Sequence, residues 1–397
     1  MSDSQRQLDC DMMRRAIALA TRGRGRVEPN PMVACVLVKD GRVIGEGYHA
    51  QFGGPHAEPQ AIASCSESPQ GATAYVTLEP CCHTNKKTPP CVPALIDAKI
   101  ARVVVGCVDP NPDVNGKGLE LLRTVGIRVD VNVLEDSAKQ LLAPFIAGVV
   151  YDRPYVTLKW AESADGKVAG PGGKRLQISN PLSTRIVHEL RGRCDAVMVG
   201  INTVLFDDPL LTARDVPIVR PMLRVVLDSQ LRIPLESKLV RTAMQHRLIV
   251  EYDRGLAGAE AGKLRALQHA GAQPFMAERR VNGLNLEQIL QPMAHFGVTH
   301  VLIECGPTLA WSFFDSGLAD RVWLIRSTSV HVDDPSAPGG VGVPGHYIRT
   351  GEITLDGDHL TEYLNPNSPV FFSPDPSADF QLAALSAQTS AASEAAV

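Results

Sequence analysis

Apolar residues recur along the first 150 residues in short runs that alternate between strand and helix spacing. Continuous or alternating apolar runs predict strands at 32–39, 42–46, 72–78, 102–108 and 127–133. Helical spacing predicts helices at 9–22, 57–66, 92–99, 117–125 and 135–147, the first capped by Asp9 or Asp11. Asp40-Gly41 predicts a hairpin turn between the first two strands. Alternating units of this kind indicate a sheet with helices on its faces.

The same alternation restarts after Tyr151-Asp152-Arg153-Pro154. The predicted strands are 155–160, 196–200, 223–228, 247–251, 300–304 and 321–326. The predicted helices are 181–193, 259–271, 286–296 and 308–316. A second sheet of this size needs its own core, so the pattern predicts two α/β domains, at 1–150 and 151–365.

Composition changes near residue 366, where Pro, Ser, Ala, Gln and Asp dominate. We expect residues 366–397 to be a mostly disordered acidic tail, since 351–397 contain seven acidic residues and no Lys or Arg. The whole chain has 397 residues, 44% of them apolar, and a net charge of −4. That charge gives no basic field for nucleic acid or an anionic membrane.

Targeting signals and cysteine usage narrow the class further. There is no apolar run long enough for a transmembrane helix, and the polar N-terminus does not look like a secretory signal peptide. The nine cysteines are scattered and odd in number, which favours metal binding, catalysis or burial over a disulfide framework. A cytoplasmic protein is the resulting expectation.

Three short motifs predict a metal centre in the first domain. They are His56-Ala57-Glu58, Glu79-Pro80-Cys81 and Cys91. This pattern is typical of zinc-dependent nucleobase deaminases. One imidazole and two thiolates can hold Zn²⁺ and leave a fourth position open for water, which the metal makes more acidic. Glu58 is the predicted acid/base catalyst, and His56, Cys81 and Cys91 are the predicted ligands. A buried histidine among unrelated cysteines is the plainer alternative.

Further motifs of the first domain resemble one enzyme family, the bifunctional deaminase–reductases of riboflavin biosynthesis. The motifs are Pro29-Asn30-Pro31-Met32-Val33-Ala34-Cys35, Gly45-Glu46-Gly47-Tyr48-His49, Thr77-Leu78-Glu79-Pro80-Cys81, Thr88-Pro89-Pro90-Cys91 and Asp109-Pro110-Asn111-Pro112. The resemblance implies a cytidine-deaminase-like α/β/α domain acting on a diamino-hydroxy-pyrimidine that carries phosphoribosylamine. It also implies that the pyrimidine and its ribose phosphate are bound by Asn30, His49, His83, Lys86 or Lys87, Asp109 and Asn111.

The second domain resembles the reductase half of the same family, which has a dihydrofolate-reductase-like fold and uses NADPH. Its motifs include Ser163-Ala164-Asp165-Gly166-Lys167, His188-Glu189-Leu190-Arg191, Asp207-Asp208-Pro209-Leu210-Leu211-Thr212-Ala213-Arg214 and Glu304-Cys305-Gly306-Pro307-Thr308. The resemblance implies substrate contacts by Lys159, Arg191, Leu211, Arg214 and Glu304. It implies cofactor contacts by Ser163, Asp165, Thr203, Asp207, Ser229, Gly306, Pro307 and Thr308. Arg191 and Arg214 could clamp the substrate phosphate, and Gly306-Pro307-Thr308 could open a helix whose amides suit a cofactor phosphate.

Several departures from the family pattern leave alternatives open. Cys81 and Cys91 are ten residues apart where nine are usual, and Ala34 and Pro59 are atypical. Glu162, Gln177 and Cys305 stand where the family has other residues, and no motif is recognisable after Arg326. One alternative is therefore an active zinc deaminase with a degenerate second domain. The others are a deaminase of tRNA adenosine or free bases, and a zinc-stabilised binding module. The family precedent implies a homodimer or homotetramer.

Overall fold

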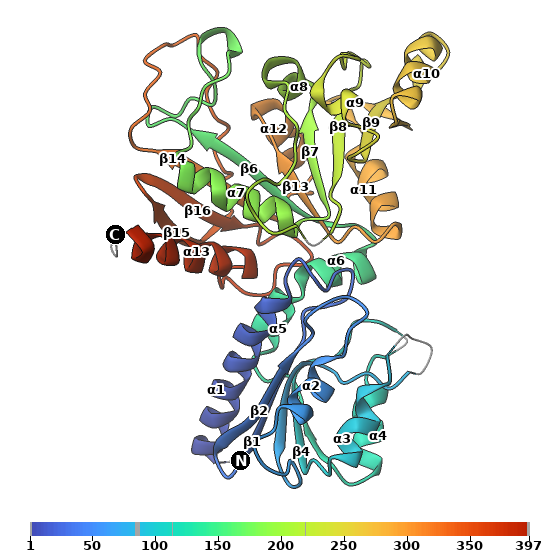
Figure 1. The fold of residues 1–397 in the computed structure, drawn as a ribbon, viewed down its shortest axis with the longest axis vertical. Coiled ribbons are helices and arrows are strands. Elements are labelled where there is room, and N and C mark those ends of the chain that lie inside the picture. Colours follow the sequence, from blue (N-terminus) through green and yellow to red (C-terminus); the bar gives the residue numbers. More distant parts are fainter. Residues whose placement is uncertain (1, 84–87, 113, 219, 395–397) are drawn as a thin grey trace. The chain divides into compact units, whose positions relative to one another are not determined.

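The computed structural model describes residues 2–83, 88–112, 114–218 and 220–394. It divides into two compact units, Met1–Tyr151 and Asp152–Val397, within one residue of the predicted boundary at 150. Figure 1 shows a mixed α/β architecture in both. None of the described helices is both long enough and apolar enough to cross a membrane. The nine cysteines all lie in the described part of the chain, and none of them forms a disulfide bond.

A five-stranded sheet forms the centre of the first unit, in the order β2-β1-β3-β4-β5. The strands are β1 (Ala34–Lys39), β2 (Arg42–Tyr48), β3 (Thr73–Leu78), β4 (Arg102–Cys107) and β5 (Arg128–Asp130). β1 pairs antiparallel with β2 and β3, whereas β3, β4 and β5 are parallel. The helices are α1 (Asp3–Ala20), α2 (Ala57–Ala63), α3 (Cys91–Asp97), α4 (Lys117–Thr124), α5 (Glu135–Leu141) and α6 (Ala143–Tyr151).

Alternation along β1 separates two apolar layers in this unit. Cys35 and Leu37 pack in the core on the side of α2, α3 and α4, while Val36 and Val38 pack with Met13 of α1. The sheet is therefore covered on both faces, as the sequence predicts (Figure 1). The predicted helix cap at Asp9 or Asp11 is wrong, because α1 begins earlier with Ser2 as its N-cap. Asp9 instead lies buried inside the helix, 2.7 Å from the Arg102 guanidinium.

Close approach of α2 to β2 places the start of that helix. A Cβ atom on Gly47 would lie 2.3 Å from the Ala61 amide nitrogen and 2.4 Å from the Ala57 carbonyl oxygen. Only glycine at this strand position allows the contact. Pro59, atypical for the family, lies in the first turn of α2, where its missing amide hydrogen is not needed.

The second unit contains a nine-stranded sheet in the order β10-β9-β8-β7-β13-β6-β14-β16-β15. Seven strands run parallel: β6 (Tyr155–Glu162), β7 (Ala196–Gly200), β8 (Leu223–Leu227), β9 (Leu248–Asp253), β10 (Ala272–Ala277), β13 (His300–Glu304) and β14 (Arg321–Ser327). The hairpin of β15 (Ile348–Leu355) and β16 (Asp358–Leu364) pairs antiparallel at one edge. A small ladder joins β11 (Arg279–Arg280) and β12 (Gly283–Leu284).

Helices cover both faces of this larger sheet. They are α7 (Pro181–Arg193), α8 (Ile201–Asp207), α9 (Lys238–Arg241), α10 (Ala261–His269), α11 (Leu286–His295), α12 (Pro307–Asp315) and α13 (Ala378–Glu394). Short 3-10 turns occur at Pro171–Gly173 and Arg254–Leu256 in this unit and at Thr21–Gly23 in the first unit. Val197 and Val199 face the α7 side, and Ala196 and Met198 face the α11 and α12 side.

The prediction of a disordered tail at 366–397 is wrong for its described part. α13 packs against α7 and β15 and buries Phe380 and Ala383 in the core. The Phe380 ring meets Trp323 edge-on, with centroids 6.3 Å apart. Asp379 lies 2.8 Å from the buried Arg321 guanidinium. Apolar anchors and a buried ion pair therefore hold a segment whose composition alone looks unstructured.

Candidate functional site

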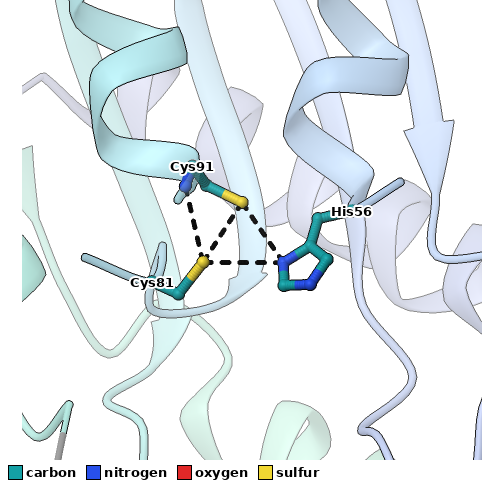
Figure 2. A group of neighbouring side chains, drawn as sticks. All are labelled: His56, Cys81 and Cys91. Carbon is teal, nitrogen blue, oxygen red and sulfur yellow. Dashed lines mark hydrogen bonds between the residues drawn. The ribbon is translucent and has the colours of Figure 1, made fainter. Parts of the chain in front are cut away.

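His56, Cys81 and Cys91 meet at the starts of two helices (Figure 2). His56 is the N-cap of α2 and Cys91 is the first residue of α3. The His56 Nδ1 atom lies 3.5 Å from the Cys81 sulfur and 3.3 Å from the Cys91 sulfur, and the two sulfurs are 3.4 Å apart. Ligand atoms of a tetrahedral zinc ion are separated by about 3.5–3.8 Å, given its bond lengths. The three predicted ligands thus form one metal-sized cluster.

The chemistry of this cluster fits a cation. The hydrogen bond with Cys81, and then burial, raise the pKa of the Cys91 thiol far above its ordinary value. Two thiolates are therefore unfavourable here unless a positive charge lies between them. Thr88 Oγ1 lies 3.1 Å from His56 Nε2, so the imidazole can donate there while Nδ1 faces the metal position.

Glu58 lies in the first turn of α2, two residues after the histidine ligand. It is buried, and its Oε2 atom has no hydrogen-bond partner among the described residues. Burial, followed by the nearby Cys81 sulfur, raises the pKa of the Glu58 carboxyl. A buried carboxylate oxygen without a partner normally indicates a role with a ligand or water. This is the property expected of the predicted acid/base.

Asn30 and His49 form a hydrogen-bonded pair beside the metal cluster. Asn30 Nδ2 lies 3.1 Å from His49 Nε2, and His49 Nδ1 lies 3.0 Å from the Pro55 carbonyl oxygen. His49 Nδ1 therefore donates to Pro55, and its Nε2 accepts from Asn30. The His49 and His56 rings are 5.3 Å apart. Burial lowers the pKa of His49, so a neutral imidazole is favoured.

Asp109 and Asn111 lie on a loop that Glu79 holds in place. The Glu79 carboxylate accepts hydrogen bonds from the backbone amides of Asp109, Gly116 and Gly118, at 3.2, 2.8 and 2.9 Å. The sequence motif includes Glu79 but does not indicate this positioning role. Burial raises the pKa of Asp109 to about 6, and its Oδ1 accepts from the Asn111 amide.

The remaining substrate candidates of this unit are less completely described. His83 has a buried Nδ1 atom with no hydrogen-bond partner among the described residues. Lys86 and Lys87 lie outside the described residues, and so does the segment that carries the extra residue between Cys81 and Cys91.

The second unit contains a cleft of about 1000 Å³. It lies at the carboxyl ends of the central parallel strands, the edge where open α/β sheets bind ligands. Nine of the predicted reductase residues line it: Lys159, Arg191, Thr203, Asp207, Ser229, Glu304, Gly306, Pro307 and Thr308. α12 begins at Pro307 with Gly306 as its N-cap, as predicted. The start of this helix therefore lines the cleft, and a helix N-terminus is a favourable place for the phosphate of a dinucleotide.

Lys159, Arg191 and Glu304 form the charged part of this cleft. The Arg191 guanidinium donates to both Glu304 oxygens, with Nη2 to Oε2 at 2.6 Å, and to the Thr212 carbonyl oxygen at 3.1 Å. Arg191 is thus already paired, whereas the sequence predicts it as a phosphate ligand beside Arg214. Burial lowers the pKa of Lys159, and the Glu304 carboxylate opposes that shift.

Four predicted reductase residues do not line the cleft. Arg214 contacts His188, a lining residue that the sequence reasoning missed: its backbone amide donates to His188 Nδ1 at 2.8 Å, and its Nη2 lies 3.3 Å from His188 Nε2. Leu211 is buried in the core. Ser163 and Asp165 hydrogen-bond to each other at 2.6 Å, and Asp165 accepts from the amides of Val332 and Asp333. Ser163 and Asp165 therefore hold a loop.

Three residues of the second unit that depart from the family pattern, Glu162, Gln177 and Cys305, are accommodated by their surroundings. Glu162 is buried and accepts hydrogen bonds from Trp160 at 2.8 Å and Arg326 at 2.9 Å. Gln177 lines the cleft and donates to the Ser179 carbonyl oxygen. Cys305 also lines the cleft, and burial raises its pKa to about 12, so it is a neutral thiol.

Comparison with known proteins assigns both units. Residues 6–107 match the cytidine and deoxycytidylate deaminase zinc-binding region, and residues 154–328 match the RibD C-terminal domain. The riboflavin biosynthesis protein RibD of Aquifex aeolicus is 40% identical over 317 residues, which cover 80% of this chain and 86% of that protein. The protein of the same name from Escherichia coli is 38% identical, over 78% of this chain and 85% of that protein.

Solved structures agree with these relatives. Acinetobacter baumannii RibD superposes with a TM-score of 0.76 at 34% identity, covering 90% of this chain and 99% of that one. A Thermotoga maritima diaminohydroxyphosphoribosylaminopyrimidine deaminase/5-amino-6-(5-phosphoribosylamino)uracil reductase gives a TM-score of 0.75 at 35% identity, covering 91% and 99%.

Fold, sites and matches together define a two-domain enzyme, a zinc-dependent deaminase followed by a reductase that uses NADPH. The relatives match across both domains, so the alternative of a degenerate second domain has no support. The chain belongs to the RibD family of riboflavin biosynthesis proteins. This membership also replaces the alternatives of a tRNA deaminase and a binding module.

Proposed function

We propose that this chain catalyses two consecutive reactions on one phosphoribosyl-pyrimidine. The first unit hydrolyses an amino group of 2,5-diamino-6-(5-phosphoribosylamino)pyrimidin-4(3H)-one and releases ammonia. The second unit reduces the ribosyl group of the product to ribityl. The observation that carries the proposal is the buried, unpartnered Glu58 carboxylate oxygen beside the His56–Cys81–Cys91 cluster.

In the deaminase, His56, Cys81 and Cys91 hold the metal. When bound, Zn²⁺ lowers the pKa of water enough for hydroxide to form near neutral pH. Glu58 accepts the proton from water and passes it to the departing amine, for which its buried position and raised pKa are suited. Asn30, His49, His83, Asp109 and Asn111, with Lys86 or Lys87, bind the pyrimidine and its ribose phosphate. The neutral His49, fixed by Pro55, supports directional recognition of a heterocycle.

In the reductase, Lys159 and Glu304 orient the sugar hydroxyls, and NADPH supplies the hydride when bound. Arg191 fixes the Glu304 carboxylate through two hydrogen bonds, which restricts its orientation. Arg191 and Arg214 form the side of the site assigned to the substrate phosphate, with Arg214 joined to the cleft through His188. Leu211 is buried in the core and does not line the cleft, so we assign it no direct contact with the phosphate. Thr203, Asp207, Ser229 and Gly306–Thr308 contact the cofactor.

A two-step assay on the zinc-loaded chain tests the proposal. The diamino substrate is supplied, ammonia is measured, and NADPH is then added and its loss is followed. Glu58→Gln should abolish ammonia release while retaining zinc and the reduction of pre-deaminated substrate. Lys159→Met should retain ammonia release and NADPH binding but slow NADPH loss. Absence of ammonia from zinc-loaded wild-type protein would refute the deaminase assignment, and ammonia without NADPH loss would refute the reductase assignment.

We also propose that the enzyme is a homodimer or homotetramer in the cytoplasm. Its nine cysteines form no disulfide bond, and three of them lie at the metal cluster or beside it, which suits a reducing compartment. Phe275 and Met276 are about half exposed on the edge strand β10, where a second copy could cover them. Light scattering of the purified chain gives the mass, and a monomer would contradict the assembly.

A further inference from the structure

Arg232 lines the reductase cleft and has no place in the function described so far. Arg232 follows β8, three residues after Ser229, and both side chains line the cleft. Its Nη2 atom donates to Asn202 Oδ1 at 3.0 Å. Among the residues that the structure describes, none offers Arg232 a carboxylate within ion-pair distance. The amide orients the guanidinium without cancelling its charge, so the charge remains available to an anion.

The surroundings of Arg232 suit a nucleoside. Leu227, Leu284 and Leu286 line the same cleft and belong to one apolar cluster. Leu227 ends β8, directly before the turn that carries Ser229 and Arg232. Ser312 and Asn282, which hydrogen-bond to each other at 3.3 Å, add polar groups to this wall. Apolar surface with a few polar groups is the usual composition of a ring-binding pocket.

The position of β8 separates this wall from the reacting end of the cleft. In the sheet, β8 lies two strands from β13, which carries Glu304, and three from β6, which carries Lys159. Strands about 4.8 Å apart put these elements roughly 10 and 14 Å from β8. An extended dinucleotide with its nicotinamide near Lys159 and Glu304 therefore has its adenosine end on the β8 side.

We infer that Arg232 binds the 2′-phosphate of NADPH and thereby makes the reductase prefer NADPH to NADH. The 2′-phosphate is the group by which the two cofactors differ, and an arginine near the adenosine ribose is the usual means of accommodating it. The inference rests on the proposed reductase function, and it names the residue that sets the cofactor preference.

The cofactor affinities of three proteins test this inference without any turnover. All three tryptophans lie in the second unit, and Trp160 lines the cleft, so quenching of tryptophan fluorescence reports binding there. NADPH and NADH are titrated into wild type, Arg232→Gln and the control Arg175→Gln. Arg175 is also an exposed cleft-lining arginine, but it lies on the segment before α7. Arg232→Gln should weaken NADPH binding roughly 10- to 100-fold and leave NADH binding within about twofold.

Arg175→Gln should leave the ratio of the two affinities unchanged, and Arg232→Lys should retain part of the NADPH preference. If the ratio of NADPH to NADH affinity stays unchanged in Arg232→Gln, or is lost in Arg175→Gln instead, the inference about Arg232 is wrong, while the proposed reductase function still stands. Wild-type protein that binds neither cofactor would overturn the reductase function together with it. Urea unfolding, followed by the same fluorescence, establishes that each variant is folded.

Discussion

The candidate sites of the two units differ in how many residues form them and in how far apart those residues lie. In the deaminase unit, three ligand atoms lie within 3.5 Å of one another and a single buried carboxylate stands beside them. In the reductase unit, the site is a cleft of about 1000 Å³ lined from the four neighbouring strands β8, β7, β13 and β6 and from the segments around them. A metal needs a few side chains at fixed positions, whereas a dinucleotide needs a long surface and contributes its own reactivity.

The difference extends to how each site is held. His56 and Cys91 are positioned by the first turns of two short helices, and the loop of Asp109 by three hydrogen bonds to Glu79. The reductase site depends instead on separate strands and on the Arg191–Glu304 pair between α7 and β13. A substitution in the deaminase site should therefore abolish deamination through a local change. A substitution in the reductase site should lower the reduction rate only in part.

Removal of zinc should give the largest effect and should affect one unit only. Because the ligands all belong to the first unit, a chelator should abolish ammonia release and leave NADPH-dependent reduction of the deaminated intermediate intact. Metal analysis, ammonia release and NADPH absorbance are measured on the same sample, and added Zn²⁺ should restore deamination. Loss of both activities would contradict the independence of the two sites.

Glu304→Gln should lower the reductase kcat/KM by about 100-fold. Arg191 holds the Glu304 carboxylate through two hydrogen bonds, and the neutral amide that replaces it is held less firmly in the orientation that positions the sugar hydroxyls. Ammonia release should not change. Glu278→Gln, on an exposed side chain of the same unit, is the matched control. If the two variants have the same reductase kcat/KM, Glu304 takes no part in the reductase site.

Asp379→Asn should destabilise the second unit by about 3 kcal/mol, since it weakens the pairing of the buried Arg321. Urea unfolding followed by tryptophan fluorescence reports this unit alone, because all three tryptophans lie in it. Leu385→Ala, on the exposed side of α13, should change stability by less than about 0.5 kcal/mol. If Asp379→Asn also changes the free energy of unfolding by less than about 0.5 kcal/mol, the ion pair between α13 and the sheet does not stabilise the second unit.

Glu251→Gln should give the smallest effect, visible as a change in pH dependence. Burial raises the pKa of Glu251 from 4.5 to about 7. The folded chain keeps this proton where the unfolded chain has lost it, so the free energy of unfolding falls as pH rises from 4.5 to 7. The fall attributable to Glu251 is at most about 3 kcal/mol. Unfolding at pH 5 and pH 8 should show a smaller fall in Glu251→Gln than in wild type, and identical falls would contradict the assignment.

Much of the fold is predictable because its strands are buried on both faces. The bounds of β7 and β13 match the prediction, since both are apolar runs ended by polar or glycine residues. β15 was not predicted because most of its residues are at least partly exposed. The one usable signal was Asp356-Gly357, where positive φ values of 47° and 88° make the hairpin turn. α13 was missed because two buried apolar residues and one acid anchor an otherwise Ala- and Ser-rich segment.

The deaminase site is more predictable than the reductase site for a related reason. His56, Glu58, Cys81 and Cys91 are chemically distinctive residue types in a recognisable pattern, so the sequence alone predicts them as one site, and the structure brings the three predicted ligands together. The role of Glu79 requires its contacts with residues 30 to 39 positions away. The pairing of Arg191 with Glu304, 113 residues apart, likewise depends on the arrangement of strands, and the contact of Arg214 with His188 joins residues 26 positions apart.

Because α13 follows every strand of the reductase sheet in the sequence, its position has a consequence for synthesis. The whole first unit emerges from the ribosome long before residue 378 is added, so the deaminase can fold while the reductase is still being synthesised. Until α13 emerges, Trp323, Leu355 and Leu360 lack the Phe380 side chain that covers them. Nascent chains should therefore carry a folded deaminase unit and an exposed apolar sheet face at the same time, so the interval before α13 is made is the one in which a chaperone is most needed.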